Sequence, residues 1–253
     1  MSIRLEQLLQ TLDELLQPGQ VNDYCPNGLQ VEGKAEVCKI VSGVTASQAL
    51  VDAAIDAGAD AILVHHGYFW KGEDPCLRGM KKRRIAALIK ADVSLLAYHL
   101  PLDIHAEFGN NVQLAKKLGI NIEGGLEVGN PRSIGLYGSL LEVMSGADFG
   151  HLLETLLGRQ PLHIAGTGGP IKRVGWCTGA AQGYIQHAID LGLDAYISGE
   201  VSESTVHVAR ESNIHYYAAG HHATERYGVQ ALGEYLAEQC GIEHQFVDID
   251  NPV

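Results

Sequence analysis

The sequence predicts an α/β protein built from two similar halves, each a mainly parallel sheet flanked by helices. Strand-like and helix-like segments alternate along the chain, one long pattern occurs twice, and the most conspicuous polar residues follow predicted strands. Alternation of strands and helices favours parallel sheets, because each helix returns the chain to the start of the next strand. At 253 residues the chain can form one large domain or two small ones.

The internal repeat is clearest in the pattern Ala-Ile-Asp-x-Gly-x-Asp-Ala, which occupies residues 54–61 and again 188–195. Each copy follows a β-rich run, KIVSGVT or RVGWCT, and precedes a buried-type strand, AILV or AYIS. Both copies show an amphipathic helical pattern that ends at a glycine, Gly58 or Gly192. We therefore expect an internal duplication whose halves span roughly 38–120 and 172–243.

The likeness continues downstream, where each half has a strand followed by a histidine and, four residues later, a carboxylate. The segment ADVSLLAYHLPLD supplies His99 and Asp103, and SNIHYYAAGHHATE supplies His221 and Glu225. A helical segment that contains Val-Gln and ends in Gly-Ile follows in both halves. If HHATE opens a helix, His221 and Glu225 lie on one face of it, because positions i and i+4 are neighbours.

The remaining segments complete the expected element order. Residues 1–19 have helical apolar spacing that ends at Pro-Gly, and KKRR (81–84) is typical of a solvated helix start. The glycine-rich stretch 121–171 is expected to be a connection or insertion; it contains a helix candidate, ADFGHLLETLLG, and a turn, GTGGP (166–170), that lacks the Gly-Lys-Ser/Thr of a P-loop. The tail HQFVDIDNPV predicts a closing strand.

Composition narrows the classes of function. The formal net charge of −12 argues against unaided binding to nucleic acid or to an anionic membrane. No apolar run reaches the length of a membrane span, and the N-terminal segment lacks the apolar core of a signal peptide. The five cysteines are odd in number and show no C-x-x-C spacing, so we expect reduced, buried thiols and a cytoplasmic protein.

The candidate site lies beyond the carboxyl ends of strands, where open α/β sheets bind ligands. His65 and His66 end the predicted strand AILVHH, and neighbouring strand residues face apart, so each is expected to bind a different ion. Imidazoles combined with carboxylates suit divalent metals such as zinc, manganese, iron or nickel. Any one of these residues is more often an ordinary polar loop residue, but together at matched repeat positions they favour a metal site. The expected ligands are His65, His66, Asp103, His221 and Glu225.

Other residues are weaker candidates for the pocket. His99, at the repeat position of His221, is expected either to bind metal or to hydrogen-bond a ligand. Phe69 and Trp70 are expected either to stack on a planar base or to pack as core. The further pocket candidates are Thr45, Glu200 and His222. The expected domains are 1–123, which carries His65, His66, His99 and Asp103, and 124–253, which carries the connecting segment, His221 and Glu225.

At these residues the chain resembles the GTP cyclohydrolase I type 2 homologues, also called Nif3-like proteins. The motifs that carry the resemblance cover nearly the whole chain. They are YCPNGLQVEG (24–33), VTAS (44–47), VHHGYFWKG (64–72), HLPLD (99–103), SGEVSE (198–203), GHHATE (220–225) and DIDNPV (248–253). The sequence departs mildly from the family, with His-His-Gly where many members have His-His-Pro and HLPLD where many have His-Thr-x-x-Asp.

The resemblance implies a Nif3-like fold, a dinuclear metal site and a ring-shaped homohexamer with the sites facing an interior cavity. Carried over residue by residue, the family's ligands correspond to the same five positions that the repeat indicates. The site would hold two divalent ions per subunit, which could be zinc, manganese, iron, nickel or magnesium. A carboxylate would bridge the two ions, and Glu225 is the candidate.

The expected activity is that of a metal-dependent hydrolase, with Glu225 as its key catalytic group. The family name suggests a purine nucleotide such as GTP, attacked at C8 with opening of the imidazole ring. Hydrolysis of phosphoesters or of altered nucleotides would use the same centre. The alternative is a non-catalytic metal-binding ring with a regulatory, scaffolding or metal-handling role, and a nucleic-acid-binding ring is discouraged by the negative charge.

Overall fold

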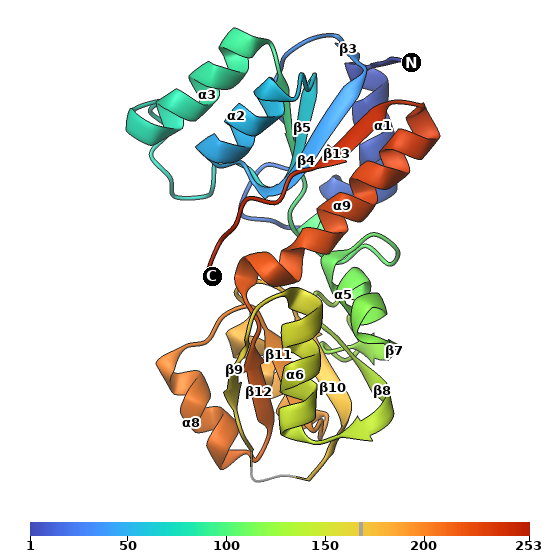
Figure 1. The fold of residues 1–253 in the computed structure, drawn as a ribbon, viewed down its shortest axis with the longest axis vertical. Coiled ribbons are helices and arrows are strands. Elements are labelled where there is room, and N and C mark those ends of the chain that lie inside the picture. Colours follow the sequence, from blue (N-terminus) through green and yellow to red (C-terminus); the bar gives the residue numbers. More distant parts are fainter. Residues whose placement is uncertain (167–168) are drawn as a thin grey trace. The chain divides into compact units, whose positions relative to one another are not determined.

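The computed structural model describes residues 1–166 and 169–253, which divide into two compact units (Figure 1). The first unit comprises Met1–Phe108 and Gly228–Asp250, and the second comprises Gly109–Tyr227 and Asn251–Val253. Residues 167 and 168, part of the turn predicted at GTGGP, lie outside the described residues.

The first unit is built on a five-stranded sheet in the order β13-β4-β5-β6-β2. The pairings from β13 through β4 and β5 to β6 are parallel, and β2 joins the other edge antiparallel to β6. The strands are β2 (Gly28–Val31), β4 (Lys39–Thr45), β5 (Ala61–His66), β6 (Ser94–Ala97) and β13 (Glu243–Phe246), with a separate antiparallel pair of β1 (Ile3–Arg4) and β3 (Glu36–Val37).

Helices cover both faces of this sheet. Leucines of α1 and the second part of α9 form one core cluster with inward residues of β4, β5 and β6, whereas α2 and α3 form a second cluster on the opposite face. Side chains alternate along each strand, so a fully buried strand such as β5 supplies both clusters. The helices are α1 (Leu5–Leu16), η1 (Pro18–Gln20), α2 (Gln48–Asp56), α3 (Gly79–Ala91), α4 (Leu100–Asp103) and α9 (His221–Cys240).

The second unit has a six-stranded sheet in the order β7-β8-β10-β11-β12-β9. The central strands β10, β11 and β12 are parallel, and antiparallel strands flank them on both sides. The strands are β7 (Ile120–Gly125), β8 (Leu136–Met144), β9 (Leu162–Ile164), β10 (Ile171–Cys177), β11 (Ala195–Ser198) and β12 (His215–Ala218). The predicted α/β class therefore holds in both units, with parallel strands at the centre of each sheet.

Two core clusters again cover the two faces of the second sheet. One contains α5, α6 and the first turns of α9, and the other contains α7 and α8 (Figure 1 labels α5, α6 and α8). The helices are α5 (Asn110–Leu118), α6 (Gly146–Leu157), η2 (Gln182–Tyr184), α7 (Ile185–Asp190) and α8 (Glu203–Glu211). The helix expected at ADFGHLLETLLG is α6, which begins at the Ser145 cap.

Two aspartates at equivalent positions of the repeat have the same structural role in the two units. Asp60 Oδ2 accepts hydrogen bonds from the amides of Cys38 and Lys39 at 2.9 and 3.2 Å. In the second unit, Asp194 Oδ2 accepts from the amides of residues 172 and 173, at 2.9 and 2.8 Å. Each carboxylate thus holds the start of the first parallel strand, β4 or β10, and this shared role supports the predicted duplication.

The units differ from the expected halves at their C-terminal helices. α5 and β7, expected in the first half, belong to the second unit, because Leu114 and Leu118 join its core and β7 pairs with β8. Gly228–Asp250 belongs to the first unit, because β13 pairs with β4. A single boundary between residues 123 and 124, as expected from the sequence, does not describe these two units. The units exchange their C-terminal helices through pairing between distant segments, which local patterns do not reveal.

Other local expectations can be compared directly. No described helix is long and apolar enough to cross a membrane. All five cysteines are free thiols, as expected, but Cys38 and Cys76 are exposed and only Cys25 and Cys177 are buried. The stretch expected to be a connection contains most of the antiparallel strands β7, β8 and β9, because short glycine-rich strands carry little periodic signal. Gly58 and Gly192 were expected to end two helices. These helices are α2 and α7, and each ends two residues before its glycine.

Replacing Asp60 with alanine should destabilise the first unit. The side chain is buried and also accepts from Lys34 Nζ at 2.8 Å; burial raises the pKa of Asp60, but these hydrogen bonds outweigh it and lower the pKa. Asp60→Ala leaves two strand amides without their acceptor, so we expect a loss of about 1–3 kcal/mol in the free energy of unfolding, measured by urea denaturation. Asp52→Ala, an exposed site on α2, is the control and should change stability by about 0.5 kcal/mol or less. Equal effects of the two substitutions would contradict the role given to Asp60.

Candidate metal centre

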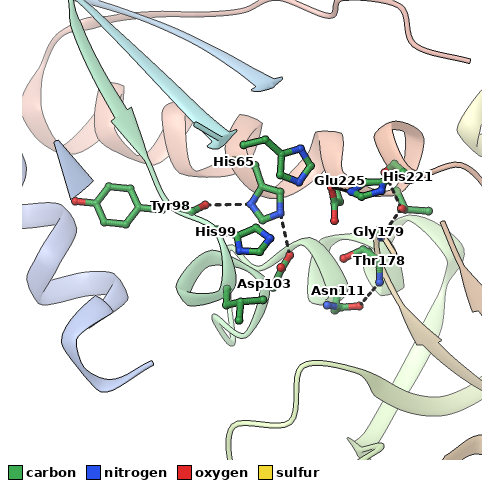
Figure 2. Close-up of polar contacts among 12 residues, drawn as sticks. His65, Tyr98, His99, Asp103, Asn111, Thr178, Gly179, His221 and Glu225 are labelled. Atoms are coloured by element: carbon green, nitrogen blue, oxygen red, sulfur yellow. Dashed lines mark hydrogen bonds and ion pairs between the residues drawn. The ribbon is translucent and has the colours of Figure 1, made fainter. Parts of the chain in front are cut away.

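His65 is held in one orientation at the end of β5. Its side chain is completely buried, and Nδ1 lies 3.0 Å from the carbonyl oxygen of Tyr98 (Figure 2). A carbonyl only accepts, so Nδ1 carries a hydrogen and Nε2 is the nitrogen available to a ligand. Nε2 faces Asp103, whose Oδ1 is 3.5 Å away. Histidines that bind metals are commonly oriented by such a bond from the other ring nitrogen to a carbonyl.

His66, the next residue, is oriented by a different partner. Its Nδ1 lies 3.1 Å from the hydroxyl oxygen of Thr45, a residue that β4 pairs directly with His66 in the sheet. The rings of His65 and His66 are tilted by 45° with centroids 4.6 Å apart, although the two residues alternate along the strand. Thr45 was expected only as a pocket residue, and the structure gives it this specific contact with His66.

His99 joins the two histidines from the end of β6. Its Nδ1 lies 2.8 Å from Asp23 Oδ1, and its ring centroid lies 5.0 Å from that of His65. One donor nitrogen from each of His65, His66 and His99 lies within 4.8 Å of the other two. Three imidazole nitrogens at this spacing can hold a zinc-like divalent cation, so the donor chemistry of the first unit fits a metal ion.

Asp23 fixes His99 and the loop around it. In addition to His99, its carboxylate accepts from the amides of Tyr24 and Leu100 and from the side chain of Asn27, at 2.7, 2.9 and 3.0 Å. Burial raises the pKa of Asp23, but the hydrogen bonds with His99 and Asn27 dominate and lower it to about 2. Asp23 is therefore ionised at neutral pH and keeps the hydrogen of His99 on Nδ1.

The aromatic residues beside this cluster divide their roles. Trp70 lies against His99 with centroids 5.0 Å apart and against His66 at 6.0 Å. Phe69 instead contacts Tyr68 edge-on and lies under the ammonium of Lys81. Of the two aromatics considered from the sequence, Trp70 is the one placed to contact a ligand at the histidines.

In the second unit, α9 begins at His221 and places His221 and Glu225 on one face, as the i, i+4 spacing predicts. His221 Nε2 lies 3.1 Å from Glu225 Oε2, and its Nδ1 lies 2.7 Å from Glu200 Oε1. Burial lowers the pKa of His221, but hydrogen bonds to the two carboxylates outweigh burial and raise the pKa to about 9. The imidazole thus bridges two acids as a cation, and a metal ion could take the place of its Nε2 proton.

The turn after β10 comes close to the Glu225 carboxylate (Figure 2). A Cβ added at Gly179 would lie 2.1 Å from Glu225 Oε1 and 3.2 Å from His221 Nε2, and Gly179 has φ of +68°. The turn is held by two amide hydrogen bonds, from Thr178 to Asn111 Oδ1 and from Gly179 to Thr224 Oγ1, both 3.1 Å long. Only glycine allows the backbone to pass this near to the carboxylate.

Each predicted residue can now be placed within its own unit. The first unit brings together His65, His66, His99, Asp103 and Thr45, and the second brings together His221, Glu225 and Glu200. His222 is buried beside them on α9, and its amide donates to the carbonyl of Val253 at 2.9 Å. Asp23 and Gly179 were not anticipated. Asp23 directly precedes the YCPNGLQVEG motif, which was the available signal, whereas nothing in the sequence around Gly179 marks its closeness to Glu225.

The stability that Asp23 provides should depend on pH. A carboxyl whose pKa falls from 3.8 to about 2 on folding stabilises the protein above its unfolded pKa and loses that effect as the pH drops through the folded value. A shift of this size corresponds to about 2 kcal/mol of pH-dependent folding free energy. Solvent screens little of it, because the side chain is only 3% exposed. Urea unfolding of wild type and Asp23→Asn should show a stability difference that is constant above about pH 5 and shrinks between about pH 4 and 2. A difference that does not change with pH would rule out the ionised carboxylate as its source.

Gly179→Ala should weaken metal binding by the second unit. The new methyl group would displace the Glu225 carboxylate, so we expect divalent-ion affinity, measured by calorimetry with Zn²⁺ and Mn²⁺, to fall about 10-fold or more. Gly158→Ala is the matched control, because Gly158 has a similar φ of +71° and open space around it. Both substitutions add backbone strain of about 1 kcal/mol, but only Gly179→Ala should alter the metal isotherm. Similar isotherms for the two variants would exclude Glu225 from metal binding.

Comparison with known proteins identifies close relatives over the full length. The family model Duf34/NIF3 (NGG1p interacting factor 3) matches residues 3–252. A protein of Pseudomonas aeruginosa named GTP cyclohydrolase 1 type 2 homolog is 62% identical over 252 residues, with 100% of each chain covered. A Vibrio cholerae protein with the same name is 58% identical, with 98% of each chain covered.

Solved structures agree with these relatives. A protein called ybgI, described as of unknown function, has a TM-score of 0.96 and 50% identity, covering 99% of this chain and 100% of its own. A protein of Thermus thermophilus has a TM-score of 0.90 and 31% identity at the same coverage. With a family match over nearly every residue and the same fold in these structures, the chain belongs to the Duf34/NIF3 family.

Proposed function

We propose that this protein is a metal-dependent hydrolase whose centre holds two divalent ions. The observation that carries the proposal is the pairing of a histidine Nε2 with a carboxylate in each unit, His65 with Asp103 at 3.5 Å and His221 with Glu225 at 3.1 Å. On this proposal His65, His66 and Asp103 of the first unit and His221 and Glu225 of the second unit hold the ions. Glu225, whose carboxylate has two oxygens and is 3% exposed, is the proposed bridge.

The surrounding residues would orient the ligands. Tyr98 and Thr45 set the ring orientations of His65 and His66, and Glu200 holds Nδ1 of His221 so that Nε2 points towards Glu225. Such preset geometry lowers the reorganisation that ion binding requires. Ions bound there would act as Lewis acids and lower the pKa of a water molecule, so that it can attack an electrophilic carbon or phosphorus at neutral pH.

A nucleotide is the proposed substrate class. The relatives named GTP cyclohydrolase 1 type 2 homolog suggest a purine nucleotide, and Trp70 offers an aromatic surface beside His66 and His99 on which a planar base can lie. His99, with its hydrogen fixed on Nδ1 by Asp23, would accept a hydrogen bond or a proton at Nε2. Phosphoesters and altered nucleotides remain within the same class of chemistry.

A non-catalytic metal-binding protein is the second candidate, and the position of His99 favours it. If His99 binds metal together with His65 and His66, the protein supplies more of the coordination sphere and leaves fewer open positions for substrate. Metal binding without turnover of any substrate would support this candidate. For either function we propose a homohexamer, which the family resemblance suggests, and a cytoplasmic location, with which the five free cysteines agree.

Hydrolysis should require Glu225. Purified protein reconstituted with Zn²⁺, Mn²⁺ or Fe²⁺ is screened against GTP, other nucleotides and phosphoesters, with formate and phosphate release as readouts. Glu225→Ala should lower the activity that is found by about 100-fold or more, because it removes the proposed bridge. Glu234→Ala is the control, since Glu234 is an exposed residue of the same helix.

The possible outcomes separate the candidates. Formate release from GTP supports the cyclohydrolase version, and turnover of other nucleotides or esters alone replaces it with a broader hydrolase. Activity that survives Glu225→Ala does not belong to this centre. Tight metal binding by wild type without any turnover across the screen would exclude the hydrolase and leave the metal-binding role.

A further inference from the structure

The second unit contains a pocket that the proposed metal ligands do not account for. Its volume is about 390 Å³, which lies within the range of small-molecule sites. Five of its eight lining residues are apolar, namely Leu162, Val201, Ala218, Pro252 and Val253, and its two charged side chains are Arg159 and Glu200. Apolar residues combined with a few polar groups are the usual composition of a ligand site.

Arg159 is the unusual member of this lining. The residue is half-buried, its Nη1 is shielded from solvent and has no hydrogen-bond partner, and no described residue forms an ion pair with it. Shielding a cationic nitrogen without a partner costs several times the energy of an ordinary lost hydrogen bond. A bound anion would remove that cost.

The backbone leaves room for the guanidinium. A Cβ on Gly220 would lie 2.5 Å from Arg159 Nη1 and 2.7 Å from its Cδ, so the arginine packs directly on the backbone of Gly220. Gly220 immediately precedes α9, a helix of 20 residues. The guanidinium therefore lies beside the positive end of a long helix, where an anion is favoured.

The second charged residue of the pocket already has a partner. Glu200 Oε1 lies 2.7 Å from Nδ1 of His221, which donates a hydrogen bond to it. The Glu200 carboxylate thus has a hydrogen-bond partner within the described part of the protein, whereas Arg159 Nη1 has none. The pocket consequently favours a ligand with negative charge at its Arg159 end.

We propose that this pocket binds an oxyanion group of a small molecule, a phosphate or a carboxylate, through the Arg159 guanidinium. The planar fork of an arginine matches two oxygens of either group. The apolar wall that includes Leu162, which is 53% exposed, would cover the uncharged body of the ligand. That the ligand is the substrate of the metal centre rests on the proposed function; the binding of an oxyanion does not.

The test measures binding to the full-length protein after metal removal with a chelator, so that no anion is held by a metal ion. Isothermal titration calorimetry is run with GMP, guanosine and benzoate. Wild type should bind GMP about 10-fold or more tightly than guanosine, and Arg159→Gln should abolish most of that difference, because a hydrogen-bonded charge pair is lost. Arg159→Lys should give an intermediate affinity, since it keeps the charge but loses the fork.

Arg210→Gln is the matched control, an exposed arginine of the same unit, and should bind GMP like wild type. Circular dichroism confirms that each variant is folded. Tight binding of GMP with weak binding of benzoate assigns the site to phosphate. Comparable affinities for GMP and benzoate assign it to oxyanions in general. Equal GMP affinity of wild type and Arg159→Gln, or equal affinity of wild type for GMP and guanosine with no benzoate binding, overturns the proposal. Because binding needs no turnover, these results are independent of the hydrolase screen.

Discussion

The parallel register of the central strands is the constraint on which the candidate ligands of each unit depend. In the first unit, β4 pairs Thr45 with His66, and β5 pairs Val64 with Ala97, which brings Tyr98 beside His65. In the second unit, β10, β11 and β12 end together at Cys177, Ser198 and Ala218. A shift of one residue in either sheet would turn each of these side chains to the opposite face.

Because the strands end in register, the loops that follow them converge. In the second unit the loop residues Gly179 and Glu200 lie against Glu225 and His221 of α9, and Gly220, which precedes α9, packs against Arg159. In the first unit the equivalent position of β6 leads to His99, which is then locked by Asp23. The sheet supplies the alignment, and short-range contacts in the loops supply the orientation of each imidazole.

The features that could be predicted from the sequence are those with local signals. The repeat, the buried strands and the start of α9 at His221 follow from patterns within about 20 residues. By contrast, the contact between Asp23 and His99 joins residues 76 apart, and neither residue's neighbours reveal it. The patterns of α5 and α9 predict helices correctly, but Leu114 joins the core of the second unit and Leu236 that of the first, opposite to their order in the repeat. Periodicity thus defines an element and its buried face, whereas the sheet it covers is decided by packing between distant segments.

Charge balance connects the two proposals for the second unit. His221 lies between the carboxylates of Glu200 and Glu225, and the shielded Nη1 of Arg159 has no hydrogen-bond partner among the described residues. If a divalent cation replaced the proton on His221, the positive charge near the start of α9 would increase by one unit. An oxyanion at Arg159 would then be attracted more strongly, and its presence would in turn favour the cation, because coupling between two sites is reciprocal. A ligand that spans both places would therefore gain affinity from the metal without any further change in the protein.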